Sequence, residues 1–268
     1  MSLEPLIRRA LAGELGAAPD EAVVSVGFTT RQGVRHTGRG GGYRNEVVSL
    51  RVGRAVGSCA VEPGTVADAD VHDCVGRTVA ELLGHPLRAV RVAALDAYLM
   101  DLRPHAEHAE PVVVPAGDSL AKSLARAGAV VDLLDPAPGQ RVLVVGVVNS
   151  LLHHLRARGV GYLPCDRKGG STEWDEPVAT DAREHIGDCD AILASGMVLG
   201  DDGVDLLLGH ARETGVPLVF FAQTGSAVLP WFIGDGARAV SAEPYPFFWL
   251  DGGPSTLHRY RQSPEVVR

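Results

Sequence analysis

The chain has 268 residues, of which 46% are hydrophobic and 22% charged, and its formal net charge is −8 at pH 7. This composition is typical of a globular protein, and the negative charge argues against a nucleic-acid partner, because phosphate binding needs clustered Lys and Arg. No apolar stretch approaches the ~20 residues that a membrane-spanning helix needs, so no membrane partner is expected. The first residues lack the basic start and the unbroken apolar segment of a signal peptide, which predicts a cytoplasmic protein.

The first half of the chain predicts a helix, then strands, then further helices. Leucines recur at helical spacing over residues 1–16. Three strands are predicted from β-branched and apolar runs, at 22–33, 45–53 and 55–63. Two helices are predicted between 66 and 101, divided at Pro86, because proline stops a helix and is accepted at the start of the next. Strands followed by helices indicate an α+β unit.

A connector and one more helix complete this half. Residues 105–117 are rich in proline and charge, which is typical of an exposed connector. The following stretch predicts a helix that begins after Asp118, a residue suited to the N-cap. The segment 135–140, "DPAPGQ", is interpreted as the boundary between units. The predicted domains are therefore residues 1–135, a smaller α+β domain with the connecting helix, and residues 136–268, a Rossmann-like domain.

The second half alternates strands and helices, which is the pattern of a parallel, doubly wound α/β sheet. Continuous apolar runs predict strands at 141–148, 160–166, 190–196, 216–225 and 237–244. The intervening helices are expected at 149–158, near 178–187, at about 202–214 and around 226–234. The predicted fold class is thus α/β, with a carboxy-terminal Rossmann-like parallel sheet.

Ligands of open α/β sheets bind beyond the carboxyl ends of the strands, so the residues at those ends form the predicted binding site. They are Gly146, Asn149, Asp166, Ser195, Gly196, Met197, Gln223, Thr224 and Gly225. The stretch "AQTGS" at 222–226 has two interpretations. It is either an anion-binding turn at a helix N-terminus or an ordinary helix cap without a ligand.

Cofactor motifs are incomplete. "VGVVNSLLH" after the first parallel strand lacks the G-x-G-x-x-G that a dinucleotide pyrophosphate needs. Asp166 stands where an acid would hold a ribose hydroxyl, and its alternative role is to cap the turn or to face solvent. A nucleoside or S-adenosylmethionine needs no pyrophosphate-binding turn, so it stays an alternative to a divalent metal ion. The four cysteines form no CxxC pair, and no strong zinc pattern is present. Cys165 and Asp166 are the candidate metal ligands.

Four segments carry a resemblance to a known family: "GRTVAELLGHPLRAVRVAALDAYL" (76–99), "VLVVGVVNSLL" (142–152), "CDAILASGMVLGDDGVDLLL" (189–208) and "VFFAQTGSAVLPWFIGDGARAV" (219–240). They resemble the heavy-metal chelation family, in which an enolase-N-terminal-like domain precedes a Rossmann-like domain. The resemblance implies that fold and a chelated ligand. The sequence departs from the family pattern at Asp96, where the family has Asn, at Asp201, and at Gln223-Thr224-Gly225, where the family has Gly-Pro-Ser.

These observations predict a small-molecule binding protein that holds an anionic or metal-chelated ligand in a cleft between the domains. The alternative is an enzyme of specialised metabolism, a transferase or lyase with a nucleoside-type cofactor such as S-adenosylmethionine in the same cleft. In that case Glu46, Asp96 or Tyr245 would supply acid–base chemistry. A homodimer is a further expectation, and a non-catalytic assembly module is the third alternative.

Overall fold

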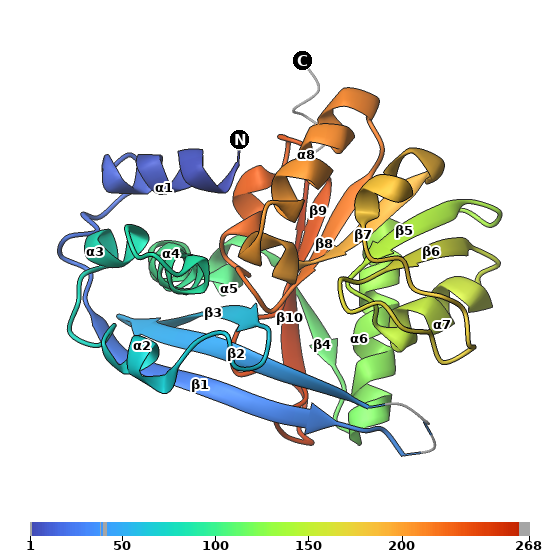
Figure 1. Ribbon diagram of the computed structural model, residues 1–268, viewed down its shortest axis with the longest axis horizontal. Helices are drawn as coiled ribbons and strands as arrows, with labels where there is room; N and C mark the ends of the chain where they lie inside the picture. The colour runs from blue at the N-terminus through green and yellow to red at the C-terminus, as the bar shows by residue number, and fades with distance from the viewer. Residues whose placement is uncertain (1, 38, 40–41, 263–268) are drawn as a thin grey trace.

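The computed structural model of the chain describes residues 2–37, 39 and 42–262. It contains a three-stranded antiparallel sheet and a seven-stranded, mostly parallel sheet, which stand side by side (Figure 1). The predicted α/β class with a smaller α+β unit is therefore confirmed. Within the described residues, no helix has the length and apolarity that crossing a bilayer requires.

The first unit packs helices against one face of the small sheet, whose order is β1-β2-β3. Its three strands confirm the predicted ones. Gly57 of β3 lies so close to α4 that an added Cβ would be 2.0 Å from the backbone nitrogen of Ala97, so only glycine fits. The elements are α1 (Leu3–Leu11), β1 (Val24–Val34), β2 (Tyr43–Val52), β3 (Ala55–Val61), α2 (Asp68–His72), α3 (Val79–Leu83) and α4 (Arg88–Leu102).

The large sheet has the order β4-β10-β9-β8-β7-β5-β6, in which β9, β8, β7, β5 and β6 are parallel. β10 is antiparallel to both of its neighbours. The remaining elements are α5 (His105–His108), β4 (Glu110–Val114), α6 (Ser119–Leu134), β5 (Arg141–Val145), α7 (Asn149–Ala157), β6 (Gly161–Cys165), η1 (Ala182–Glu184), η2 (Ile186–Asp188), β7 (Ala191–Ser195), η3 (Gly196–Gly200), α8 (Gly203–Thr214), β8 (Leu218–Ala222), η4 (Leu229–Phe232), β9 (Ala239–Ala242) and β10 (Ser255–Arg261).

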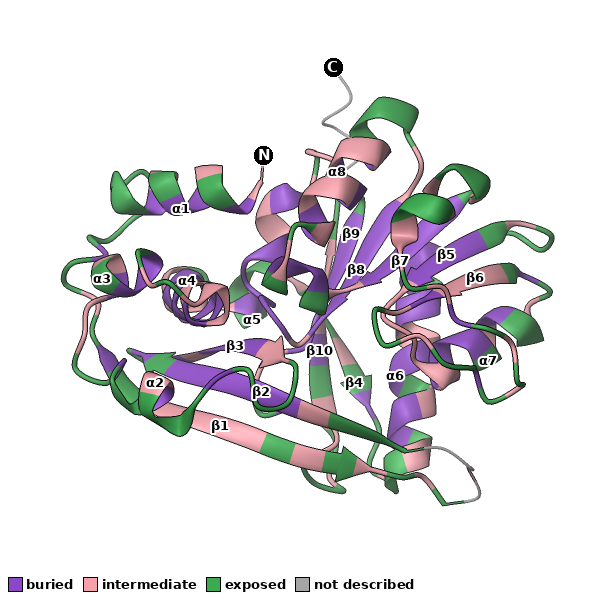
Figure 2. Cartoon of the chain, in the orientation of Figure 1, coloured by how far each residue is buried: buried purple, intermediate pink, exposed green. Residues whose placement is uncertain are grey.

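The central strands are apolar on both faces because each face is covered. Alternate residues of one strand enter different cores. In β8, Val219 and Phe221 pack with α6 and α7, whereas Leu218 and Phe220 pack with α8 and the first unit. Figure 2 shows β8 buried along its length, while the edge strand β6 is only partly buried.

Two strands of the large sheet were not predicted, and they shift the division of the chain. β4 lies inside the expected connector and pairs with β10, through the register Leu257↔Val112. The helix α6 packs on α7, where the hydroxyls of Ser123 and Ser150 are 2.9 Å apart. Residues 110–134 thus lie with the second sheet, although the predicted boundary assigns them to the first domain.

Other expectations need correction. The stretch near 178–187, expected to be a helix, contains only the 3-10 turns η1 and η2, and the helix expected around 226–234 is the short 3-10 turn η4. The connector that begins at His105 is not exposed throughout, since His105 is 4% exposed and lies in the one-turn helix α5.

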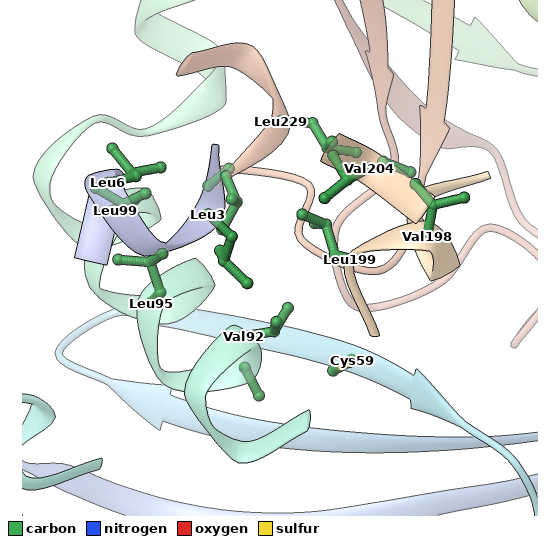
Figure 3. Close-up of a cluster of buried hydrophobic side chains, with 14 of the residues drawn as sticks. Leu3, Leu6, Cys59, Val92, Leu95, Leu99, Val198, Leu199, Val204 and Leu229 are labelled. Atoms are coloured by element: carbon green, nitrogen blue, oxygen red, sulfur yellow. The ribbon is translucent and has the colours of Figure 1, made fainter. Parts of the chain in front are cut away.

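One hydrophobic core runs through both units. Side chains of the first unit, among them Cys59 and Val92, meet Val198, Leu199 and Leu229 of the second (Figure 3). Leu3 of α1 belongs to the same cluster and is fully buried. Because the apolar faces of both units are covered by each other, the junction between them is a packed interior.

Candidate functional site

The turns that follow the parallel strands lie at a common edge, as predicted. An added Cβ on Gly146, after β5, would be 2.6 Å from the Cβ of Ser195, at the end of β7. An added Cβ on Gly196 would be 2.2 Å from the carbonyl oxygen of Thr224, after β8. Both glycines therefore allow neighbouring turns to approach closely, and the edge is continuous from β5 to β8.

The turn after β8 is held by the first unit. Thr224 is 2% exposed, and its hydroxyl oxygen accepts a hydrogen bond from the backbone N–H of Ala60 in β3 at 2.8 Å. The N–H of Gly225 donates to the carbonyl oxygen of Ser58 at 3.0 Å. Two of the predicted binding residues thus have partners from the small sheet.

Asp96 supplies a negative charge to the same turn. One of its carboxylate oxygens accepts from the N–H of Ala227 at 2.6 Å, and the other accepts from the N–H of Ser58 at 2.8 Å. Burial raises the pKa of Asp96 to about 7, although these backbone donors act in the opposite direction. The N–H groups that the sequence offered to an anion are therefore used by a carboxylate of the chain itself.

The polar side chains after β6 and β7 accept hydrogen bonds from backbone N–H groups of their own turns and, in one case, of the turn after β5. The carboxylate oxygens of Asp166 accept from the N–H groups of Val147 and Lys168, at 3.2 and 3.0 Å. The hydroxyl of Ser195 accepts from the N–H of Met197 at 3.3 Å. These bonds are those of ordinary capping and turn residues.

Two further predicted positions lie on the same side of the sheet. The side-chain oxygen of Asn149 accepts from the N–H of Glu173 at 3.3 Å, which joins the start of α7 to the polar loop after β6. Burial raises the pKa of the Cys165 thiol to about 11, so it stays protonated at neutral pH. In the described part of the chain, no group of three or more His, Cys, Asp or Glu side chains is placed to hold a metal ion.

The three acid–base candidates have different surroundings. Glu46 is 5% exposed and lies 3.4 Å from Arg31, opposite it in the β1–β2 register. Asp96 is at the junction described above. Tyr245 packs edge-on against Phe28 of β1, with ring centroids 5.2 Å apart. The structure places these candidates in three separate environments.

A buried ion pair lies at the β9 end of the edge. Glu243 follows β9 and is 1% exposed, and Arg126 of α6 is 5% exposed. The Nε of Arg126 donates to both carboxylate oxygens of Glu243, at 2.8 and 3.0 Å. The side-chain amide of Gln223 lies 3.5 Å from the same carboxylate, and the Phe221 ring centroid lies 4.7 Å from the guanidinium carbon. The cation is thus held between an acid and an aromatic face.

The terminal amino groups of Arg126 have no hydrogen-bond partner in the part of the chain that the structure describes. Among the described residues, neither Nη1 nor Nη2 makes a hydrogen bond, because only Nε is bonded. Neither of them is a fully buried unpaired atom, so both reach solvent-accessible space. Sequence reasoning missed Arg126. The available signal was Lys122 and Arg126, two cations four residues apart beside the apolar stripe of a helix.

The β1–β2 hairpin covers this end of the edge. The indole N–H of Trp249 donates to Oε1 of Gln32 in β1 at 2.8 Å. The side-chain nitrogen of Gln32 is buried and unpaired. Trp249 packs edge-on against Phe248, with centroids 4.8 Å apart, and the Phe248 ring centroid lies 5.8 Å from the guanidinium carbon of Arg126. The side chains of Trp249 and Phe248 thus connect β1 to the surroundings of Arg126.

Two surface cavities lie elsewhere. One of about 240 Å³ is lined by residues of α4, of β10 and of the segment 227–231. The other, of about 350 Å³, is lined by the end of α8 and the segments 215–217 and 234–238, together with Gln262. The predicted binding residues are not among the residues that line either cavity.

Comparison with known proteins supports the fold. No family model matches the chain, and no curated protein sequence matches it significantly. Two solved structures of proteins of unknown function from the DUF364 family are similar in fold. The one from Desulfitobacterium hafniense DCB-2 has a TM-score of 0.56 and 16% identity and covers 88% of this chain and 85% of its own. The one from Pyrococcus horikoshii has a TM-score of 0.55 and 17% identity, with 88% and 86% covered. This chain shares their two-domain α/β fold.

Proposed function

We propose that the protein binds a small anionic ligand at the β9 end of the carboxyl edge, with Arg126 as the group that holds its negative charge. The observation that carries the proposal is a buried guanidinium with two unpaired amino groups that reach accessible space. A guanidinium presents parallel N–H donors that match a carboxylate, and such pairs are among the strongest hydrogen bonds in proteins.

The hydrogen bonds that Arg126 can still make support this role. A hydrogen bond to a charged group contributes about 1.5–3 kcal/mol, and both Nη1 and Nη2 reach accessible space. Glu243 offsets the charge of Arg126 but occupies only its Nε. An anion across Nη1 and Nη2 would complete the hydrogen bonds of the group.

Charge balance favours a carboxylate over a phosphate dianion. Glu243 already neutralises Arg126, so the site offers hydrogen-bond donors to one singly charged carboxylate group, such as each of those in citrate, without the net positive charge that would hold a phosphate dianion. The next cation on α6 is Lys122, whose ammonium group donates to the carbonyl oxygens of Asp251 and Gly253. It is therefore occupied in holding the turn before β10.

A metal ion would enter this site as part of its ligand. The described residues offer no cluster of metal-ligating side chains, and the Cys165 thiol is protonated at neutral pH. A metal–carboxylate chelate brings its own ligands and still presents carboxylate oxygens to Arg126. The sequence resemblance to the heavy-metal chelation family agrees with such a ligand. Asp166 has no ligand-binding role in this proposal, since both of its oxygens accept backbone N–H groups.

Calorimetric titration with citrate, with and without Zn²⁺, tests the proposal on two variants. Arg126→Met combined with Glu243→Gln removes both charges without leaving either one buried alone, and such replacement of a buried pair is often neutral for stability. It should abolish binding. Glu243→Gln alone removes the neutralising charge, so it should tighten the binding of citrate several-fold.

The matched control is Arg141→Gln, which removes one positive charge at the exposed start of β5, on the opposite edge of the sheet. It should leave the affinity for citrate unchanged. Equal affinity in the wild type and the double variant would contradict the proposal. Weaker binding of citrate by Glu243→Gln would contradict the expected effect of removing the neutralising charge beside Arg126.

A further inference from the structure

A second candidate site lies on another side of the molecule. The cavity of about 240 Å³ lies between the end of α4, the turn that contains η4, and β10. Pockets for drug-sized ligands measure about 300–1,000 Å³, so this volume suits a smaller molecule. The lining residues are Leu99, Arg103, Ala227, Pro230, Trp231 and Tyr260.

Of the described residues that line this cavity, Arg103 alone is charged. Its guanidinium carbon lies 5.4 Å from the centroid of the Trp231 ring. Its side chain has no hydrogen bond or ion pair with any residue that the structure describes. Stacking on an indole uses the face of a guanidinium and leaves the N–H donors at its edge available. The cavity therefore holds a cation that is oriented by an aromatic ring and open to an anion.

Tyr260 adds a hydroxyl in a fixed position. Its oxygen is 2.8 Å from Nδ1 of His105, and Nε2 of His105 is 3.3 Å from the hydroxyl of Ser226. Burial lowers the pKa of His105 to about 3, so the ring is neutral at physiological pH. Burial also raises the pKa of Tyr260 to about 12, so the phenol keeps its proton. His105 thus orients the hydroxyl of Tyr260 while it stays neutral, so Arg103 supplies the positive charge for an anion in this cavity.

We propose that this cavity binds a small amphipathic anion, a carboxylate on an apolar or aromatic body. The carboxylate would lie against the free edge of Arg103 and the hydroxyl of Tyr260, and the apolar body would pack on Leu99 and Pro230. The site shares no residue with the Arg126 environment, so this proposal can be tested independently of the function proposed above.

Benzoate is a suitable probe, with benzamide as its uncharged analogue of the same shape. The indole N–H resonance of Trp231, assigned with a Trp231→Phe variant, reports binding at this cavity. We expect benzoate to shift that resonance, and benzamide to bind about tenfold more weakly because it lacks the charge. Arg103→Gln should bring benzoate down to the level of benzamide, while Tyr260→Phe should weaken it only a few-fold.

The double variant Arg126→Met with Glu243→Gln serves as the control and should leave the Trp231 response to benzoate unchanged. The proposal is overturned if benzoate does not shift the Trp231 resonance at millimolar concentration. Equal affinities for benzoate and benzamide, or full affinity in Arg103→Gln, would overturn it as well.

Discussion

In the turn after β8, the local motif correctly predicted backbone N–H donors but could not predict which group would accept their hydrogen bonds. The sequence "AQTGS" predicted free N–H groups at a strand-to-helix junction, and the structure has N–H donors there. The anion that accepts from Ala227 is Asp96, 131 residues earlier in the chain. Spacing along a sequence cannot show a contact of that range, so the motif left ligand and cap as open alternatives.

Arg126 illustrates the opposite case. Ligand-binding residues of α/β sheets are expected at the carboxyl ends of strands, whereas this cation projects from the middle of a helix that covers the sheet. A charged residue beside the apolar stripe of a helix is normally predicted to be exposed to solvent. Only the register of α6 against the sheet shows that it is 5% exposed and paired with Glu243.

The buried carboxylate of Asp96 predicts a dependence of stability on pH. Its pKa is raised to about 7 in the folded state from 3.8, so the folded protein binds the proton more tightly than the unfolded chain does. The stabilisation from this group is therefore full below about pH 4 and is lost as the pH rises through 7. Three pKa units correspond to at most about 4 kcal/mol.

Asp96→Asn should remove this contribution. Urea unfolding at several pH values between 4.5 and 8 measures it, and the difference in unfolding free energy between wild type and variant should change in favour of the variant as the pH rises. A difference that is constant over this range would show that Asp96 does not titrate in it.

At the scale of elements, the strands that the sequence predicted are those buried on both faces. β5, β7 and β8 are continuous apolar runs because helices or the first unit cover each side. β4 begins with Glu-Pro, and β10 reads "STLHRYR", with mostly polar and charged residues. The apolar run of β4 is limited to Val112–Val114, between two prolines, and β10 has none. Both form because β10 pairs with β4 on one side and with β9 on the other.

The approach of β3 to α4 gives a test by substitution. Gly57→Ala places a methyl group 2.0 Å from the backbone nitrogen of Ala97, so β3 or α4 would have to shift its backbone to remove the clash. We expect a loss of about 1–3 kcal/mol or more in the free energy of unfolding. The matched control is Gly209→Ala in α8, where nothing in the described chain apart from the helix itself lies within 4 Å of the added methyl group. It should stabilise the protein by about 0.5–1 kcal/mol. Equal effects at the two sites would refute the close packing of β3 on α4.

At the scale of the whole molecule, the two units share one hydrophobic core, although each has its own sheet. Strands followed by helices predicted the architecture of the first unit, and alternation of strands and helices predicted that of the second. The sequence pattern could not show that Leu199, after β7, and Val92 of α4 would belong to one core, because an apolar residue does not identify the residues that it will contact. The division of the chain near residue 135 was predicted from local composition, which could not show that β4, which precedes it, pairs with β10 far beyond it.

This shared core predicts cooperative unfolding. All three tryptophans, at 174, 231 and 249, lie in the second unit and report on it by fluorescence. Far-ultraviolet circular dichroism reports on both units. Because neither unit keeps its apolar face covered when the other unfolds, the two signals should change at the same urea concentration. Two separate transitions would show that the units are stable independently.

The central claim is that the guanidinium of Arg126 is the anion-binding group of the carboxyl edge. A crystal structure of the protein with citrate, at a concentration fixed by titration, tests it most directly. We predict a carboxylate of citrate across Nη1 and Nη2 of Arg126, with the Nε bonds to Glu243 unchanged. The account would be contradicted if those amino groups donated to protein atoms while citrate lay elsewhere or was absent.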